Sequence, residues 1–230
     1  MRANFGLAMK KKWKKDSTPV TITDIKINKL VITGVRKYFT EHGVLGEEES
    51  YNAIGKEYLW VCDPVDGTVP FSHGIPTFVF SLALVRNGQP ILGVICDCIM
   101  NRMYVAEKGK GSFMNGKRIR VNKSGLKNSV AFWDVKTVGR LWKKYPKVFW
   151  FNLYSICYEG IMVANGYAIA AFYDYHNAHD IAALKVIVEE AGGKVTDMNG
   201  KDQRYDRAIN GALITNGRVH GELLRMIKGS

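Results

Sequence analysis

The sequence lacks any apolar run long enough to cross a membrane. A membrane-spanning helix needs about 18 or more consecutive apolar residues, and the 230-residue chain contains no such stretch. The N-terminal lysines are not followed by the apolar segment of a secretory signal. We therefore expect no membrane partner and a cytoplasmic location.

Cysteine is scarce, with only Cys62, Cys96, Cys98 and Cys157 in the chain. Four cysteines in a protein of this length do not make a disulfide framework. Cys96 and Cys98 form a Cys-x-Cys pair, but no second pair completes the ligand set of a structural zinc site. We expect reduced and mostly buried thiols.

Acidic residues are also few: 21 Asp and Glu stand against 33 Lys and Arg, so the net charge is +12. Such a charge attracts anionic partners, either a nucleic acid or a small phosphorylated substrate. The run "KKKWKK" at residues 10–15 is interpreted as a solvated, lysine-rich helix end. The other basic residues are scattered without an RNA-binding signature. We do not expect a nucleic-acid partner, and a basic nucleic-acid-associated binding module is kept as the non-enzymatic alternative.

What the sequence does contain is the apolar periodicity of an α+β fold. One helix is expected in 18–39, with Ile27, Leu30, Val31, Val35 and Tyr38 on its buried face. Further helices are expected at 155–166, at 180–193 with Asp180 as N-cap, and at the C-terminus. Strands are expected at 58–62, 129–135, 168–175 and 212–217, in a hairpin over 77–98 and in 103–121. We expect a single domain over 1–230, with halves of about 1–125 and 126–230.

The stretch "VCDPVDGTVPF" at residues 61–71 sets Asp63 and Asp66 directly after an apolar run. Burying two like charges is costly unless a positive charge lies between them. A divalent cation would supply that charge, because Mg²⁺ binds carboxylates and substrate phosphate together. Gly67 would let backbone N–H groups approach an anion, and the Thr68 hydroxyl could position a water molecule.

Each acidic residue also has a plain structural explanation. Asp24 and Asp180 could be helix N-caps, which is a common role of aspartate. Glu47 in "LGEEES" could belong to a solvated loop, and Asp66-Gly67 could be an ordinary turn. Residue types and spacing alone leave these alternatives open.

Four ordered motifs resemble those of the inositol monophosphatase family. "WVCDPVDGT" followed by "FSHGIPTFVFSLALVRNGQPILGVICD" resembles the first family signature, Asp-Pro-x-Asp-Gly-Thr. "HDIAALKVIVEEAGG" is similar to the second signature, while "TPVTITD" and "LGEE" match the upstream motifs. The resemblance covers residues 17–217. It implies a layered αβαβα sandwich of the inositol monophosphatase and fructose-1,6-bisphosphatase type, and a lithium-sensitive phosphatase that uses two to three Mg²⁺ ions. It also implies a homodimer.

The resemblance also implies roles for individual residues. Glu47, Asp63 and the Val65 carbonyl would hold one Mg²⁺; Asp63, Asp66 and Asp180 would hold a second, and a weaker third ion would lie near Glu47. Thr68 with Asp24, assisted by Glu47, would orient the attacking water. Asp66, Gly67 and Thr68 would contact the phosphorylated substrate, with the N–H groups of Gly67 and Thr68 on its phosphate.

The substrate side is matched less closely. The family places an acidic residue several positions before the second-motif aspartate to bind substrate hydroxyls. Asp174 is the best match with a one-residue gap, whereas the ungapped position holds Tyr173. Ser155 resembles a position that lines the substrate site, and a helix N-cap is the alternative role.

The expected function is hydrolysis of a small phosphorylated polyol, inositol monophosphate first, by metal-activated water. Histidinol phosphate, fructose 1,6-bisphosphate and a 3′-phosphonucleotide are alternative substrates for the same chemistry. A catalytically silent member of the family is a further alternative, although all the principal metal ligands are present. The identity of the alcohol and the number of bound ions stay open.

Overall fold

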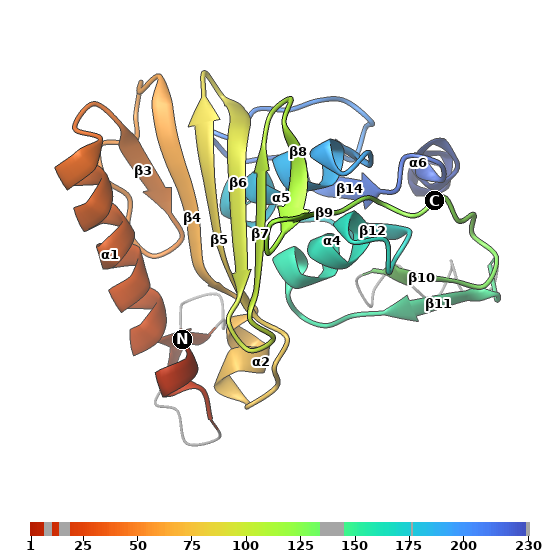
Figure 1. Ribbon diagram of the computed structural model, residues 1–230, viewed down its shortest axis with the longest axis horizontal. Helices are drawn as coiled ribbons and strands as arrows, with labels where there is room; N and C mark the ends of the chain where they lie inside the picture. Colours follow the sequence, from red (N-terminus) through yellow and green to blue (C-terminus); the bar gives the residue numbers. More distant parts are fainter. Residues whose placement is uncertain (7–10, 14–18, 134–144, 176, 229–230) are drawn as a thin grey trace.

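The computed structural model describes residues 1–6, 11–13, 19–133, 145–175 and 177–228. Their elements form layers in the order helix, sheet, helices, sheet, helix (Figure 1). The outer helices are α1 (Ile22–Tyr38) and α6 (His220–Lys228), and the central ones are α4 (Ile156–Ala164) and α5 (Ala178–Glu190). This is the α+β sandwich that the sequence predicted.

The larger sheet has seven strands in sequential order. They are β3 (Gly43–Gly46), β4 (Tyr58–Asp66), β5 (Val79–Arg86), β6 (Gln89–Asp97), β7 (Arg102–Glu107), β8 (Gly111–Met114) and β9 (Lys117–Arg118). Only β3 and β4 run parallel, and the other neighbours are antiparallel. Asn87 and Gly88, with φ of 51° and 85°, make the turn between β5 and β6. Both residues tolerate positive φ, so the expected hairpin is confirmed.

The smaller sheet has five strands in the order β11-β10-β12-β14-β13. Its strands are β10 (Ser129–Phe132), β11 (Val148–Phe151), β12 (Ala170–Tyr173), β13 (Lys194–Thr196) and β14 (Ala212–Thr215). Near the N-terminus lie the 3₁₀ helix η1 (Arg2–Asn4) and the antiparallel pair β1 (Lys11–Trp13) and β2 (Pro19–Thr21). The short helix α2 (Thr68–Ser72) follows β4.

Helix α5 is buried on all sides because it lies between the two sheets. Every residue from Asp180 to Val188 is buried, and the helix contacts β4 to β8 on one side and β13 and β14 on the other. A helix without a polar face is typical of such a central layer. The position of Asp180 is therefore fixed by the main core of the protein.

Several details differ from the sequence predictions. Strand β4 does not end at Cys62 but continues to Asp66, with a shift of register between Asp63 and Asp66 that accommodates Pro64. Asp180 is not an N-cap, since Asn177 holds that position and Asp180 lies in the first turn. Lys11–Trp13 of the lysine-rich run form a strand rather than a helix end, and residues 10, 14 and 15 lie outside the described residues.

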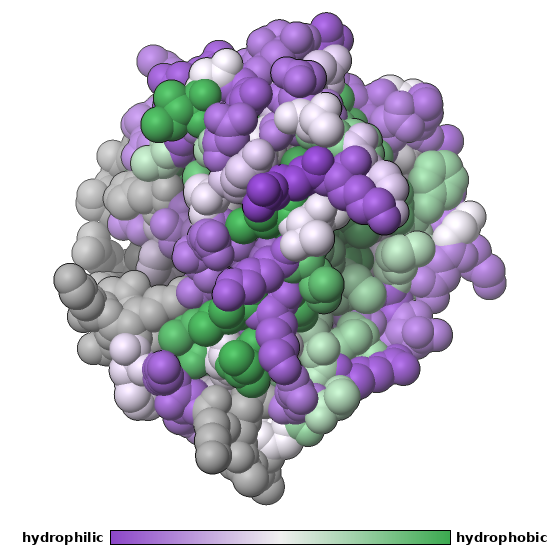
Figure 2. Space-filling model, turned by 90° about the vertical axis from the view of Figure 1, so that its left-hand side faces the viewer, coloured by the Kyte–Doolittle hydropathy of each residue, from purple (hydrophilic) through white to green (hydrophobic). Residues whose placement is uncertain are grey.

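The buried face of α1 is also different from the expected one. Ile32 and Val35 pack with Val44, but Leu30 is 70% exposed and Tyr38 is 68% exposed. Leu30 instead borders an open apolar groove of about 450 Å³ beside Phe80. Hydrophobic side chains between hydrophilic ones are visible on this side of the molecule (Figure 2).

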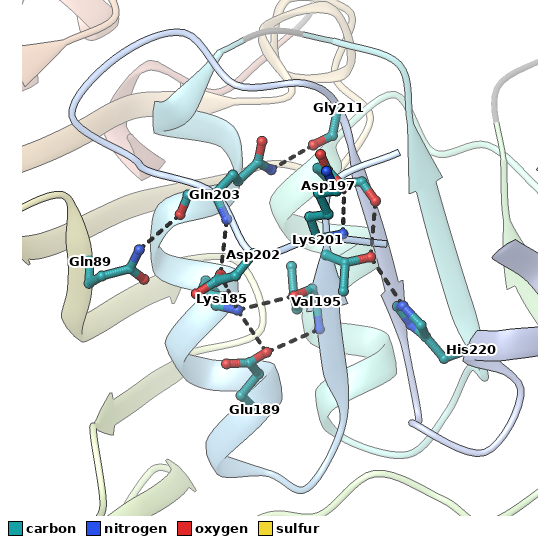
Figure 3. Close-up of polar contacts among 11 residues, drawn as sticks. Gln89, Lys185, Glu189, Val195, Asp197, Lys201, Asp202, Gln203, Gly211 and His220 are labelled. Carbon is teal, nitrogen blue, oxygen red and sulfur yellow. Dashed lines mark hydrogen bonds and ion pairs between the residues drawn. The ribbon is translucent and has the colours of Figure 1, made fainter. Parts of the chain in front are cut away.

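A buried lysine ties α5 to the loop that follows β13. The Lys185 ammonium donates to Glu189 Oε1 at 2.9 Å and to the Val195 carbonyl at 3.1 Å, and pairs with Asp202 Oδ1 at 2.9 Å (Figure 3). Gln203 extends the network through its backbone carbonyl, which accepts from Gln89. The network anchors the middle turn of α5, the helix that carries Asp180 in its first turn.

None of the helices in the described ranges is long and apolar enough to span a membrane.

Candidate active site

Strand β4 brings Asp63 and Asp66 to one buried place. The two side chains are 3% and 4% exposed, although both are carboxylates. Strand pairing with β5 is irregular between them, and the Asp63 carboxylate accepts the Val65 N–H at 2.9 Å. In a regular strand, residues three apart point to opposite faces of the sheet. Because of the irregularity, Asp63 and Asp66 can both contribute to the same site.

Asp180 joins these two residues from the first turn of α5. Asp63, Asp66 and Asp180 each offer a carboxylate oxygen, and the three oxygens lie within 4.8 Å of one another. Glu47, Asp63 and His179 form a second group with the same spacing. The structure thus brings together metal ligands expected from three separate parts of the chain.

Glu47 reaches the cluster because the chain continues alongside β4 after β3 ends. Its N–H donates to the Cys62 carbonyl at 3.1 Å, one residue before Asp63. Glu47 also forms a third acidic group with Asp24 and Glu48.

Asp66 lies against the N-terminus of α4. Its carboxylate accepts the N–H groups of Ile156 and Cys157 at 3.1 and 2.9 Å, and it accepts the Ser155 hydroxyl. Ser155 is also the N-cap of α4 and accepts from Tyr158 N at 3.3 Å. The alternative role of Ser155 as a helix N-cap is thus observed, and the same residue lines the cavity, as its predicted role in substrate binding requires.

Asp24 is held in a capping box at the start of α1. The N-cap is Thr21, and its N–H and hydroxyl both donate to Asp24 Oδ2. The Thr68 hydroxyl lies 3.4 Å from Asp24 Oδ1 and 3.0 Å from the Val65 carbonyl. The fully buried Asp24 therefore has a structural role and also contacts the residue expected to position water.

Gly67 is required between β4 and α2. Its φ of 86° lies in the left-handed region, and an added Cβ would stand 2.8 Å from both Ser155 Cβ and the Thr77 carbonyl. Any side chain here would be strained and would push against the wall of the cavity.

Three carboxylates lie close together here, and among the residues that the structure describes the one basic side chain that pairs with them is His179, 3.4 Å from Asp180. Burial raises the pKa of Asp63 well above its usual range, and the neighbouring Glu47 and Asp66 raise it further. Burial, Asp66 and Glu47 likewise raise the pKa of Asp180. Burial raises the pKa of Asp66 to about 6 even though Ser155 and the α4 amides stabilise its anion. Carboxylate oxygens in this number are the donor set of a hard divalent cation, so the residues fit a metal site.

The cluster forms one wall of a cavity of about 490 Å³. Tyr173 lines this cavity, whereas Asp174 is exposed and is not part of the lining. The lining also includes Glu159, which sequence reasoning missed because a glutamate inside a helix usually faces water. His179 also lies beside the cluster, with its Nε2 3.4 Å from Asp180 Oδ1.

Comparison with known proteins places this arrangement in a family. The profile described as "Inositol monophosphatase family" matches residues 2–229. A fructose-1,6-bisphosphatase/inositol-1-monophosphatase of Thermotoga maritima is 33% identical over 90% of this chain and 82% of its own length. A histidinol-phosphatase of Chlorobaculum parvum is 33% identical over 84% of this chain and 78% of its own length.

Solved structures agree with the sequence matches. An IMPase of Thermotoga maritima superposes with a TM-score of 0.90 at 30% identity, covering 99% of this chain and 91% of that one. An IMPase/NADP phosphatase complexed with Mg²⁺ and phosphate shares the fold, with a TM-score of 0.89 at 24% identity over 97% of this chain and 87% of that one. The chain therefore belongs to the inositol monophosphatase family and is a phosphoric monoester hydrolase.

Proposed function

We propose that the protein is a Mg²⁺-dependent phosphomonoesterase that releases phosphate from a small phosphorylated polyol, with inositol monophosphate as the first candidate. The observation that supports this most strongly is the convergence of Asp63, Asp66 and Asp180 within 4.8 Å in a buried wall of the cavity. Like charges at this spacing are tolerable in a core only when protons or cations neutralise them.

The ions would be held by two sets of oxygen ligands. Glu47, Asp63 and the Val65 carbonyl form one set, and Asp63, Asp66 and Asp180 form the other; a third, weaker ion would bind near Glu47. When bound, Mg²⁺ would polarise the phosphoryl group and stabilise charge on the leaving oxygen.

Thr68 and Asp24 are proposed to orient the water that attacks phosphorus. The Thr68 hydroxyl has a single proton and two acceptors within reach, Asp24 Oδ1 and the Val65 carbonyl. Its own lone pairs are then available to accept a hydrogen bond from water. Burial raises the pKa of Asp24, which suits a group that takes up a proton. Glu47 would assist beside Asp24.

The substrate's phosphate is proposed to lie against the N–H groups of Gly67 and Thr68. They are the N-cap and first residue of α2, so their N–H groups need partners outside the helix. Asp66 and Ser155 lie at the same cavity wall and would contact the substrate from the side of α4. Water is the nucleophile in this scheme, so no phosphoenzyme forms.

The names of the relatives indicate which alternative substrates to consider. They include a fructose-1,6-bisphosphatase/inositol-1-monophosphatase, a histidinol-phosphatase and human inositol monophosphatase 1, which is 29% identical over 88% of this chain. A 3′-phosphonucleotide is a further alternative with the same chemistry. Dimer formation and the cytoplasmic location remain predictions.

A panel of phosphate esters tests the proposal. Inositol 1-phosphate, histidinol phosphate, fructose 1,6-bisphosphate and a 3′-phosphonucleotide are each incubated with the protein, with Mg²⁺ or with EDTA, and phosphate release is measured. We expect release only with Mg²⁺, fastest from inositol 1-phosphate and inhibited by millimolar Li⁺. Release from none of the esters in Mg²⁺ would contradict the proposal, and salt-sensitive RNA binding by the same sample would favour the nucleic-acid alternative.

A further inference from the structure

Glu159 is a buried acid of the cavity that the proposed chemistry does not use. It lies on α4, is only 2% exposed and belongs to the cavity lining. Among the residues that the structure describes, no lysine, arginine or histidine forms an ion pair with it. Burying a carboxylate in this way is costly, so its retention next to a binding cavity needs an explanation.

The Glu159 carboxylate is held in place by two donors. Oε1 accepts the Leu153 N–H, and Oε2 accepts the Tyr173 hydroxyl. A carboxylate has about four lone-pair positions, so these two hydrogen bonds leave about two available. The Tyr173 hydroxyl also lies 3.3 Å from the Ile156 carbonyl, which fixes the phenol against α4. The carboxylate is thus oriented firmly while keeping capacity to accept further hydrogen bonds.

Glu159 lines the same cavity as the metal-binding acids, at a position that suits the alcohol part of a substrate. Ser155, which donates to Asp66, and Glu159 lie four residues apart at the start of α4. Residues at this spacing lie on the same helix face, about 5–6 Å apart. A phosphoryl group bound beside Asp66 would therefore place a sugar-sized alcohol next to Glu159.

The charge of the cavity argues against a second phosphate. Apart from His179, which contacts Asp180, the described residues of the lining include no lysine, arginine or histidine. Burial raises the pKa of Glu159 to about 7, so near neutral pH the carboxyl group exists in both forms. Such a group suits neutral hydroxyls, which donate and accept, and it would not attract a phosphate.

We propose that Glu159, oriented by Tyr173, is a specificity-determining residue that accepts hydrogen bonds from hydroxyl groups on the alcohol part of the substrate. It selects monophosphates of polyhydroxylated alcohols over bisphosphates. This inference rests on the phosphatase function proposed above.

The test compares substrates that differ in their hydroxyl groups. Inositol 1-phosphate offers several hydroxyls, cyclohexyl phosphate offers none, and fructose 1,6-bisphosphate adds a second phosphate. For the wild-type protein with Mg²⁺ we expect the lowest KM for inositol 1-phosphate. For Glu159→Gln we expect the KM for inositol 1-phosphate to rise about tenfold with little change in kcat, the effect of one lost hydrogen bond to a charged group. The KM for cyclohexyl phosphate should not change.

Further variants separate this role from a structural one. Tyr173→Phe keeps the ring but frees the carboxylate, so we expect a smaller rise in KM for inositol 1-phosphate alone. Glu190→Gln is the matched control: Glu190 also accepts two backbone N–H groups, those of Gly109 and Gly111 at 2.7 Å, but lies outside this cavity. We expect it to leave both KM values unchanged.

The outcomes distinguish the two proposals. If the wild-type protein releases phosphate from no ester, the proposed function fails. If it releases phosphate but Glu159→Gln affects both substrates equally or neither, the role of Glu159 is refuted. A rise in KM with Asp174→Asn instead would assign the hydroxyl contact to the exposed acid. Should Glu159→Gln not fold, equal KM values of the wild-type protein for inositol 1-phosphate and cyclohexyl phosphate would overturn the inference without any variant.

Discussion

Two clusters of charged residues, each with a buried centre, lie at different places along α5, and they are built in opposite ways. At the N-terminal end, Asp180 meets Asp63 and Asp66, and the pKa of each carboxyl is raised. Five residues further on, Lys185 contacts Glu189, Asp202 and a carbonyl oxygen, all at 2.9 to 3.1 Å. Lys185 has acidic partners of its own, whereas among the described residues only His179, 3.4 Å from Asp180, pairs with the three carboxylates of the first cluster.

This difference separates a structural charge cluster from a functional one. The Lys185 cluster is complete without a ligand and joins α5 to the 195–203 segment (Figure 3). The cavity cluster is stable as carboxylates only when something positive enters it. Perturbed pKa values in a cavity are typical of such functional sites. The two clusters should therefore respond in opposite directions when one charge is removed.

The largest expected effect is the loss of activity in Asp180→Asn. Replacing outer-sphere residues of metal sites typically costs 10–100-fold in activity, and Asp180 is a proposed direct ligand, so we expect phosphate release to fall by at least about 100-fold. The metal-free variant should be no less stable than the wild-type protein, because one of three repelling carboxylates is gone. Initial rates with Mg²⁺ and thermal unfolding in EDTA measure the two effects.

Asp202→Asn is the matched control for that experiment. It removes a carboxylate from the Lys185 cluster, where Glu189 remains as the partner of the lysine. We expect its activity to be unchanged. Full activity of Asp180→Asn, or an equal loss in Asp202→Asn, would contradict the contrast between the clusters.

Lys185→Met should have the opposite effect on stability. It leaves the Val195 carbonyl and two carboxylates without their shared cation. Breaking a fully buried pair costs about 3–5 kcal/mol, but Glu189 and Asp202 are 38% and 60% exposed and can be hydrated. We therefore expect a loss of about 2 kcal/mol in the free energy of unfolding, which is about 4–8 °C in Tm.

The control is Lys110→Met, whose partner Glu107 lies at the surface with 48% exposure. An exposed pair contributes less than about 1 kcal/mol. A Tm of Lys185→Met equal to that of Lys110→Met would show that the buried lysine is not a structural centre.

The fold was largely predictable because its strongest elements have local causes. The β5–β6 hairpin follows from Asn87-Gly88, which tolerates positive φ, and α5 follows from its apolar periodicity. Strands β3, β11 and β13 were not predicted, because segments of three or four residues are strands only through their partners in the sheet.

The prediction of the buried face of α1 was wrong for a related reason. Asn28 is buried because its side chain donates to the Glu49 carbonyl at 2.8 Å, while the apolar Leu30 lies in the open groove. Which side of a helix is buried depends on what the rest of the chain places beside it, and a periodicity with apolar residues on two sides does not decide this.

The residues of the candidate site were likewise only partly predictable from the sequence. Asp63, Asp66 and Gly67 are close in sequence, so their spacing alone indicated chemistry. The resemblance to the family was needed to add Glu47 and Asp180, which come from other elements. Glu159 was missed because its role depends on Tyr173, 14 residues away, and on a loop N–H group. Only the folded chain shows that these groups meet.

The smallest expected effect is the pH dependence of stabilisation by Mg²⁺. In the metal-free folded protein the pKa of Asp66 is about 6, and those of Asp63 and Asp180 are also raised well above the unfolded value of about 4. The folded form therefore binds more protons than the unfolded chain above pH 4, so the stability contributed by these groups falls as pH rises through 6.

Mg²⁺ at ten times its Kd should restore about 1.4 kcal/mol near pH 7.5. It should restore less at pH 5, where protons compete for the same oxygens. Thermal unfolding at both pH values, with KCl at matched ionic strength as control, measures the difference. An equal Mg²⁺ effect at both pH values, or one that persists in Asp180→Asn, would place the ion elsewhere and remove the distinction between the two clusters.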